Sequence, residues 1–329
     1  MTDRLRNRYT VPINVFAYQH GIYPRSEKVV SATRGLDRGR VDEKGVSEAF
    51  DQDLAQFVRV QKEAQLDFFS DGLLRWQDIF RPLAESSGPM KPGPLVRWFD
   101  TNTFFRAPDF SGSIAAPKPA GIIPAASVPT PRVASLPSPY MLSRAARAGD
   151  RDRNQLMGEL AERVLRPAIA AAASAGARLV HLEEPWLAYF GIEDRDWKPF
   201  EAALAALGKP AGVTIILHTY FGDAGRFIDH LRALPVDGLG VDLVETDVSS
   251  LGSGWDKELA IGCFNGRSSG IESLESTVEL ARRVADTVRP KNLYLTSNCE
   301  LGYLPTGVAE SKVRRLGESA RRLKELVSV

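Results

Sequence analysis

Short apolar runs rich in β-branched residues recur along the chain, and longer segments of helical period separate them. This alternation is typical of strand–helix units repeated around a parallel sheet. We predict strands at eight such runs: 11–17, 66–69, 133–136, 179–182, 213–217, 239–244, 259–264 and 293–296. Eight strands with intervening helices favour a closed (β/α)8 TIM barrel over an open doubly wound sheet.

Two of the intervening segments have a clear helical period. Residues 47–65 and 155–173 each place apolar side chains three or four positions apart, which predicts helices with one buried face. No G-x-G-x-x-G follows the first strand, so a dinucleotide site is not indicated. We expect one barrel domain over residues 1–329. One stretch departs from the alternation of strands and helices, a Pro- and Gly-rich excursion at about 87–139. We expect it to be irregular and to serve as a lid.

The charge balance excludes several classes of partner. The chain has 42 Lys and Arg against 41 Asp and Glu, without a sustained run of one sign, so we expect neither nucleic acid nor an anionic membrane as partner. Residues 1–10 are polar, and no run of 18 apolar residues occurs, which predicts a cytoplasmic protein. Two cysteines, Cys263 and Cys299, cannot form a disulfide framework.

Polar side chains gather at the predicted carboxyl ends of the strands, where barrel enzymes carry their active sites. A single residue at such a position often only caps the next helix, but the whole set predicts a catalytic centre. His181, inside an apolar strand, is expected to be structural, and Cys263 to be a core residue. The strand-end set is Asp71, Glu183, Glu184, His218, Asp242, Glu245, Asn298 and Cys299.

Three members of this set could bind a metal. His218, Asp242 and Cys299 supply an imidazole, a carboxylate and a thiolate, a mixture suited to zinc with an open fourth position. Such a zinc would hold a substrate thiol as its thiolate, which is a good nucleophile. The three residues come from separate strands, and no local motif such as C-x-x-C or H-E-x-x-H accompanies them.

Short segments across nearly the whole chain match, in order, the motifs of one known family. They are GIYPR at 21–25, LDFFSDG at 66–72, WFDTNT at 98–103, LPSPY at 136–140, LEEP at 182–185, HTYFG at 218–222, LPVDGL at 234–239 and NCEL at 298–301. In this series the chain resembles the cobalamin-independent methionine synthases. The resemblance implies a (β/α)8 barrel and a methyltransferase that acts on a thiol.

Members of that family contain two related barrels, whereas this chain has one. Three motifs of this chain resemble the N-terminal barrel: TYFG at 219–222, LPVDGL at 234–239 with the residues around it, and NGR at 265–267. In the family, the zinc ligands belong to the catalytic barrel. By resemblance, His218 falls on the ligand His, Asp242 on the ligand Glu and Cys299 on one ligand Cys. Tyr220 stands in the place of the second ligand Cys.

The resemblance also implies substrate residues. Glu183 matches an Asp that binds homocysteine, and Arg25 and Lys28 match basic residues near the folate polyglutamate tail. Arg267 takes the place of a His implicated in proton transfer. Ile22 and Leu73 replace a Ser and a Glu of the homocysteine site. The predicted substrate-binding residues are Glu183, Glu184, Asp71, Arg25, Lys28 and Asn102, and the predicted catalytic residues are Tyr220, Arg267 and Glu183.

Three functions follow as hypotheses. The leading one is zinc-dependent methyl or alkyl transfer to a small-molecule thiol, most simply methionine synthesis from homocysteine, with methyltetrahydrofolate or a methylated corrinoid protein as donor. A second is a metal-free folate- or substrate-binding barrel that acts with a separate catalytic barrel. A third is a related barrel enzyme with other chemistry, in which Tyr220 and Arg267 are catalytic. Under each of these three hypotheses the chain could bind a partner protein or form a homo-oligomer.

Overall fold

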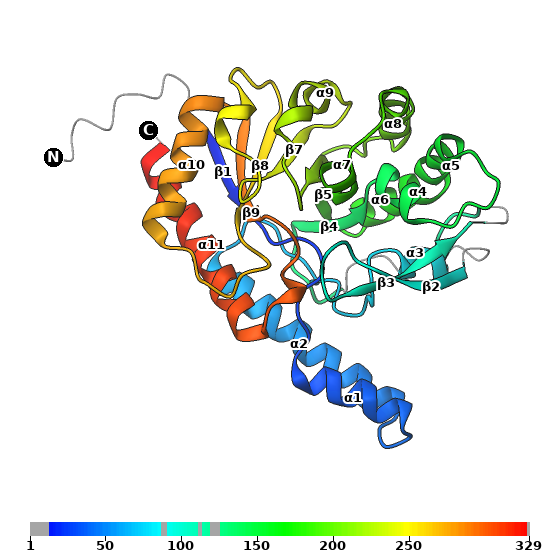
Figure 1. The fold of residues 1–329 in the computed structure, drawn as a ribbon. Coiled ribbons are helices and arrows are strands. Elements are labelled where there is room, and N and C mark those ends of the chain that lie inside the picture. Colours follow the sequence, from blue (N-terminus) through cyan, green and yellow to red (C-terminus); the bar gives the residue numbers. More distant parts are fainter. Residues whose placement is uncertain (1–12, 87–90, 111–113, 119–125, 328–329) are drawn as a thin grey trace.

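The computed structural model describes residues 13–86, 91–110, 114–118 and 126–327. Its centre is a curled parallel sheet of seven strands in the order β1-β9-β8-β7-β6-β5-β4 (Figure 1). The strands are β1 (Asn14–Ala17), β4 (Arg132–Pro137), β5 (Ala177–Glu183), β6 (Thr214–Thr219), β7 (Gly238–Asp242), β8 (Glu258–Phe264) and β9 (Asn292–Ser297).

Residues 66–69 occupy the eighth position, between β1 and β4. The Asp67 amide donates to the carbonyl of Ala17 at 2.9 Å, and the Phe69 amide donates to Pro131 at 3.0 Å. The Val133 amide in turn donates to Phe69 at 3.0 Å. The segment therefore joins the two outer strands, and the predicted (β/α)8 barrel is confirmed. All eight predicted runs fall on its strand positions, although residues 11 and 12 lie outside the described residues.

Helices cover the outside of the sheet, and both predicted helices are confirmed. The first is α2 (Glu43–Ala64), and the second is α5 (Arg153–Leu160) and α6 (Arg166–Ser174), joined by the π-helical turn Ala161–Leu165. Helix α1 and the start of α2 project from the barrel (Figure 1). The other helices are α1 (Glu27–Asp37), α3 (Arg81–Ser86), α4 (Pro139–Ala145), α7 (Pro185–Phe190), α8 (Asp194–Ala206), α9 (Ile228–Ala233), α10 (Leu274–Val288) and α11 (Thr306–Val327).

The expected irregular excursion contains an antiparallel hairpin, β2 (Lys91–Arg97) with β3 (Phe104–Asp109). The expectation of irregular structure was therefore wrong for these residues. Pro92, Gly93 and Pro94 weaken the strand signal of β2, and its register shifts between Pro92 and Leu95. The side chains of Trp98 and Phe105 are buried and pack against Phe80, just before α3.

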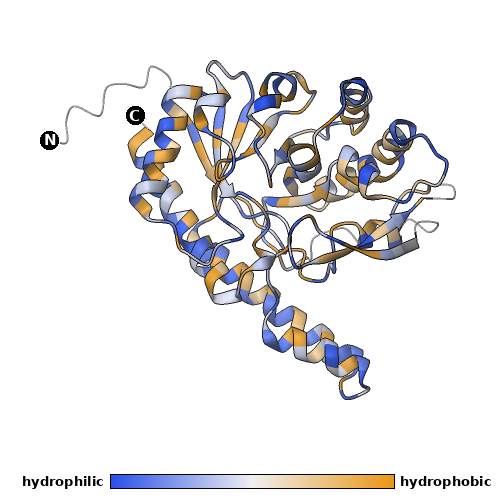
Figure 2. Ribbon diagram, in the orientation of Figure 1, coloured by the Kyte–Doolittle hydropathy of each residue, from blue (hydrophilic) through white to orange (hydrophobic). Residues whose placement is uncertain are grey.

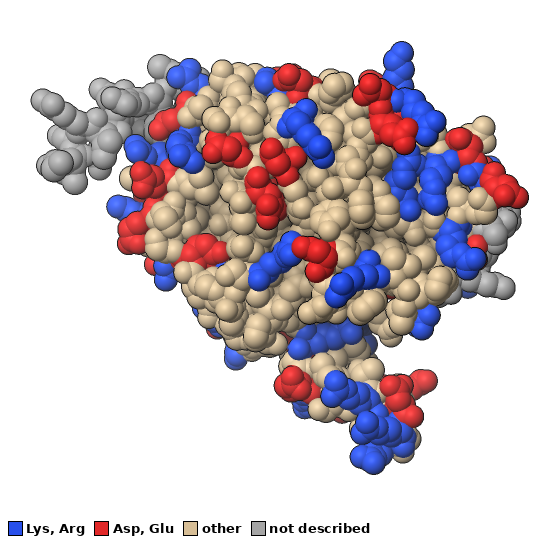
Figure 3. Space-filling view, viewed as in Figure 1, with Lys and Arg blue, Asp and Glu red and all other residues tan. Residues whose placement is uncertain are grey.

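The distribution of apolar residues fits this arrangement. In Figure 2 the central strands are mainly apolar, whereas α10 and α11 alternate between apolar and polar along their length. On the face seen in Figure 3, Lys and Arg lie interspersed with Asp and Glu, in line with a formal net charge of +1. None of the helices in the described ranges is long and apolar enough to cross a bilayer.

Candidate functional site

A cavity of about 710 Å³ opens at the carboxyl end of the barrel. The loops that follow β1 and β9 and the β2–β3 hairpin enclose it. Five aromatic side chains contribute to its wall, and three acidic residues, Glu27, Asp78 and Glu300, also line it, Glu300 from the loop after β9. The aromatic residues are Tyr23, Trp98, Phe104, Phe105 and Tyr303. A cavity of this size at this end of a barrel is the expected place for a substrate.

Glu300 joins the cavity to a buried polar network. The hydroxyl of Tyr220 donates to its Oε2 at 3.3 Å, and the hydroxyl of Tyr303 donates to its Oε1. Burial, together with the nearby carboxylate of Glu183, raises the pKa of Glu300 to about 7. Glu300 can therefore both accept and release a proton near neutral pH.

His20 and Glu183 form a buried pair behind Glu300. The Nδ1 of His20 lies 2.9 Å from Oε1 of Glu183, and its Nε2 donates to the carbonyl of Ser297 at 3.0 Å. Burial lowers the pKa of His20, but the Glu183 carboxylate raises it further, so the net shift is upward. Burial alone would raise the pKa of Glu183, whereas His20 and His181 bring it well below its usual range. Both shifts favour the charged forms, an imidazolium beside a carboxylate.

Two more histidines complete a cluster with His20. The His181 ring stacks on His20 with centroids 3.8 Å apart, and its Nδ1 lies 2.9 Å from the Tyr18 hydroxyl. Burial and His20 lower the pKa of His181 to about 4. Both ring nitrogens of His218 are buried and have no hydrogen-bond partner among the described residues. Burial and His181 lower its pKa well below the usual value, so it is neutral.

The predicted zinc ligands are not gathered in this way. In the parts of the chain that the structure describes, the group of His, Cys and acidic side chains whose ligand atoms all lie within 4.8 Å of one another is His20, His181 and His218. Asp242 instead accepts from the amide of Val244 at 2.9 Å and from Asn298 at 3.1 Å. In this conformation the ligand atoms of His218, Asp242 and Cys299 are not close enough together to hold one zinc ion.

Burial also shifts the pKa values of Asp242 and Cys299. Burial raises the pKa of Asp242 to about 6. Burial and Glu300 raise the pKa of the Cys299 thiol well above its usual value. Without a bound metal the thiol is therefore protonated, and a zinc ion would have to displace that proton. A site made of His218, Asp242 and Cys299 stays a prediction.

Glu184 and Asp71, predicted to bind substrate, hold turns in this conformation. Glu184 caps α7 by accepting from the amide of Leu187 at 2.8 Å, and it also accepts from the Ser138 hydroxyl. Asp71 accepts from the amide of Leu73 at 3.0 Å. Their structural roles are visible, and their predicted contact with substrate is untested.

The two predicted basic residues differ in position. Arg25 lines the cavity, but its guanidinium donates to the carbonyls of Leu74 and Trp76 and so fixes the loop after β1. Lys28 is exposed on α1 and donates to Gln52 of α2. Of the two, Arg25 is the one that a ligand in the cavity would meet.

The hairpin turn carries Asn102 and meets Arg267 at the barrel mouth. Asn102 is exposed and accepts from Arg97 at 3.1 Å. Arg267, from the loop after β8, donates to Asp100 at 2.8 Å and lies 5.2 Å from the ring centre of Phe221. An ion pair thus joins the hairpin turn to the loop after β8.

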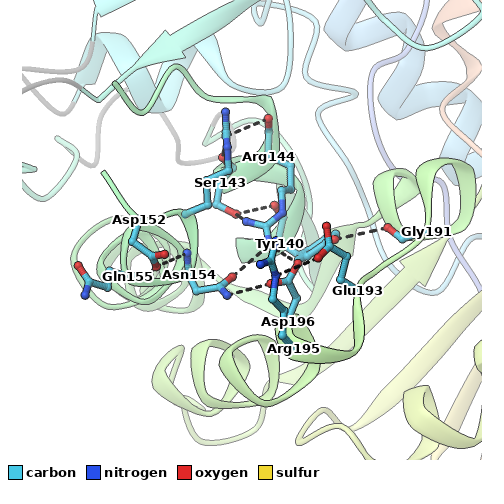
Figure 4. A network of polar contacts seen from close by, with 11 residues as sticks. Tyr140, Ser143, Arg144, Asp152, Asn154, Gln155, Gly191, Glu193, Arg195 and Asp196 are labelled. Atoms are coloured by element: carbon cyan, nitrogen blue, oxygen red, sulfur yellow. Dashed lines mark hydrogen bonds and ion pairs between the residues drawn. The ribbon is translucent and has the colours of Figure 1, made fainter. Parts of the chain in front are cut away.

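A second, polar cleft of about 490 Å³ lies on the outside, between α5 and α8. Arg144 donates to Asp196 at 2.7 Å and to Asn154 at 3.1 Å (Figure 4). Asn154 also donates to Asp196, at 2.8 Å. These paired groups tie α4, α5 and α8 together, which indicates a structural role for the cleft.

His20, Glu300 and Tyr303 were not predicted from the sequence, and His181 was predicted to have a structural role only. His20 and Glu300 each follow a strand of the barrel, so the rule that selected Glu183 also applies to them. His181 shows no such signal. Its place in the cluster depends on the barrel register, which sets Glu183 beside His218.

Comparison with known proteins places the chain in a family. Residues 76–289 match the family model described as "Cobalamin-independent synthase, N-terminal domain". Methionine synthase of Sulfolobus acidocaldarius is 24% identical over 305 residues, which cover 89% of this chain and 87% of the relative. The 5-methyltetrahydropteroyltriglutamate–homocysteine methyltransferase of Parvibaculum lavamentivorans is 29% identical over 233 residues, 66% of this chain but only 30% of that protein.

Solved structures agree on the fold. The B12-independent methionine synthase of Shewanella sp. W3-18-1, in complex with selenomethionine, superposes with a TM-score of 0.76 at 16% identity, covering 97% of this chain and 100% of that one. A putative B12-independent methionine synthase from Listeria monocytogenes gives 0.74 at 17% identity, covering 95% and 99%. The resemblance to the N-terminal barrel is confirmed by the family model, and the chain belongs to the cobalamin-independent methionine synthase superfamily of methyltransferases.

Proposed function

We propose that this protein transfers a methyl group to a small-molecule thiol, most simply to homocysteine to form methionine. The observation that carries the proposal is Glu300, a carboxyl group with a pKa of about 7 on the wall of a cavity at the carboxyl end of the barrel. Relatives that cover nearly the whole chain bear the name methionine synthase, which supports the same reaction.

Glu300 supplies the proton chemistry that this reaction needs. The thiol sulfur forms a bond to the methyl carbon while the bond from that carbon to the donor breaks. The carboxylate of Glu300 accepts the thiol proton, and the resulting acid can return it to the leaving atom of the donor. Tyr220 and Tyr303 hold both carboxylate oxygens in place, so Tyr220 acts as a positioning residue.

Glu183 and Arg267 are proposed to orient the acceptor. Glu183 would bind the ammonium group of an amino-acid thiol, with His20 giving up part of its present contact. Arg267 lies at the barrel mouth, where a carboxylate could replace Asp100 as its partner. The predicted contacts of Glu184, Asp71, Asn102 and Lys28 with substrate stay predictions.

The cavity suits a folate-like methyl donor. Sites for small organic ligands commonly measure about 300–1,000 Å³, and the value of about 710 Å³ lies in this range. Its aromatic wall can stack on a flat ring, and Arg25 lies beside it. The relative from Parvibaculum lavamentivorans is named for a methylated pteroyltriglutamate donor. A methylated corrinoid protein would have to dock outside the cavity and is the alternative donor.

Zinc is part of the proposal as a prediction. A bound zinc would lower the pKa of the acceptor thiol. The proton transfer to Glu300 does not require it, and the predicted ligands His218, Asp242 and Cys299 do not converge here. A cytoplasmic location, and a partner protein or second copy, likewise stay predictions.

A second function is favoured by one observation, the match to an N-terminal rather than a catalytic domain model. In this alternative the barrel binds folate or substrate and depends on a separate catalytic barrel. The relatives from Sulfolobus acidocaldarius and Sulfurisphaera tokodaii, of which this chain covers 87% and 91%, favour a self-sufficient enzyme. Binding of methyltetrahydrofolate without turnover, followed by turnover when a catalytic barrel is added, would establish the alternative.

We expect Glu300→Gln to lower kcat/KM for methyl transfer by roughly 10²- to 10⁴-fold, because the amide cannot accept the thiol proton. The rate of the unchanged protein should rise with pH through about 7, since the carboxylate is the active form. The pH profile of initial rates measures both effects. Glu279→Gln, on the exposed face of α10, is the matched control. An unchanged rate and profile in Glu300→Gln would remove Glu300 from the reaction.

A further inference from the structure

The histidine cluster contains buried polar atoms that the protein leaves unsatisfied. Within the described residues, Nδ1 and Nε2 of His218, Nε2 of His181 and Oε2 of Glu183 have no hydrogen-bond partner. Each of these side chains is fully buried. A buried polar group without a partner costs about 1–3 kcal/mol, so several in one place indicate a missing occupant.

The hydrogen bonds of the cluster select the nitrogens that face this occupant. His20 donates Nε2–H to the carbonyl of Ser297 at 3.0 Å, so its Nδ1 faces the cluster, where it lies 2.9 Å from Oε1 of Glu183. His181 engages the Tyr18 hydroxyl through Nδ1 at 2.9 Å, which leaves Nε2 turned inward. Metal-binding histidines characteristically donate their other ring N–H to a carbonyl or another oxygen. His20 follows this pattern, and His181 follows it in the tautomer that carries its proton on Nδ1.

The distances suit one ion. Ligand atoms of His20, His181 and His218 all lie within 4.8 Å of one another. Two nitrogens on a tetrahedral zinc are about 3.3 Å apart, as follows from zinc–nitrogen bonds of about 2.0–2.1 Å. Glu183 adds the negative charge, with Oε1 2.9 Å from Nδ1 of His20 and Oε2 3.6 Å from Nε2 of His181.

We propose that His20, His181 and His218, together with the carboxylate of Glu183, form a binding site for a divalent first-row transition metal such as zinc. Three imidazoles and a carboxylate match the ligand preferences of such ions. The site shares only His218 with the predicted zinc ligands and contains no sulfur. It does not rest on the proposed function, because metal binding is measured without substrate.

The site lies below the substrate cavity. Gly21, which follows His20, has a φ of +68°, and a Cβ there would lie 2.7 Å from Cβ of Glu300 and 3.2 Å from Oε1 of Glu183. The chain therefore passes closely between the cluster and the carboxyl group that lines the cavity. A metal at the cluster would be separated from a substrate in the cavity by Gly21 and Glu300.

Titration of the chelator-treated full chain with zinc(II) and cobalt(II) tests the proposal. We expect one equivalent to bind, and the cobalt spectrum to show visible bands without a sulfur-to-cobalt charge-transfer band. His20→Ala and His181→Ala should each weaken binding by at least about 100-fold. Cys299→Ser should leave binding unchanged. His230→Ala, an exposed histidine stacked on Trp197, is the matched control.

Two results would overturn the proposal. One is the absence of stoichiometric metal binding by the unchanged protein, which would leave water as the occupant. The other is a sulfur-to-cobalt band that disappears in Cys299→Ser, which would assign the metal to His218, Asp242 and Cys299. The spectrum of the unchanged protein separates these outcomes even where a histidine variant fails to fold. His20→Gln and His181→Asn serve as gentler substitutions, with circular dichroism as the folding check.

Discussion

Glu183→Ala is expected to lower the free energy of unfolding by about 3–5 kcal/mol, and to lower methyl transfer by at least 100-fold. The first effect arises because His20 loses its partner while both side chains are fully buried, and a buried charge without a partner is costly. The second arises because Glu183 is the proposed contact of the acceptor ammonium group. Urea unfolding and initial rates measure the two effects separately.

The loss of stability in Glu183→Ala should depend on pH. The pKa of His20 is raised by its pair with Glu183, so the stability that the pair contributes is present below the usual histidine pKa, as long as Glu183 stays a carboxylate, and is lost as pH rises through the pKa of His20. The difference between Glu183→Ala and the unchanged protein should therefore shrink in alkaline solution. Glu193→Ala, in an exposed pair with Arg195, should cost under about 1 kcal/mol. A Glu183→Ala protein as stable as this control at pH 6 would contradict the pair.

Gly317→Ala is expected to destabilise the barrel by about 3 kcal/mol or more. Gly317 lies on α11 where this helix crosses the end of α2, and an added Cβ would lie 1.9 Å from the carbonyl oxygen of Ala64 and 2.8 Å from its carbon. Backbone atoms cannot give way as a flexible side chain can, so the two helices would have to move apart. Urea unfolding at constant pH measures the loss.

Gly307→Ala provides the matched control on the same helix. A Cβ at Gly307 meets nothing within 4 Å, and alanine favours a helix over glycine by about 1 kcal/mol. Stability should therefore stay the same or rise slightly. Equal stability of Gly307→Ala and Gly317→Ala would show that α2 and α11 do not pack as described.

The barrel could be predicted from the sequence because its strands are short, apolar and separated by helices of clear period. Residues 259–264 and 293–296, for example, lie within β8 and β9. The β2–β3 hairpin could not, because Pro and Gly within β2 mask the alternation that marks an exposed strand. Residues 66–69 were predicted as a strand because their apolar pattern is that of a buried strand. In the structure they take a strand position in the barrel, but Phe69 pairs with Arg132 only through an isolated bridge.

The site was predicted in part. Strand-end position was enough to select Glu183 and His218, which the register of β5 and β6 places side by side. It was not enough to identify ligands, because residues far apart in sequence meet only once the barrel closes. His20 and His181 are 161 positions apart by their numbers, yet their rings stack at 3.8 Å. Conversely, Asp242 and Glu184 were selected correctly as strand-end residues, but their oxygens accept backbone amides.

The central claim is methyl transfer to a thiol, and the formation of labelled methionine tests it most directly. The full chain is incubated with zinc(II), homocysteine and methyltetrahydrofolate that carries an isotopically labelled methyl group, and methionine is measured by mass spectrometry. We predict labelled methionine over several turnovers, with Glu183→Ala and Glu300→Gln reduced to near background. A correctly folded protein that forms no methionine, from this donor or from methylcobalamin, would contradict the proposed function.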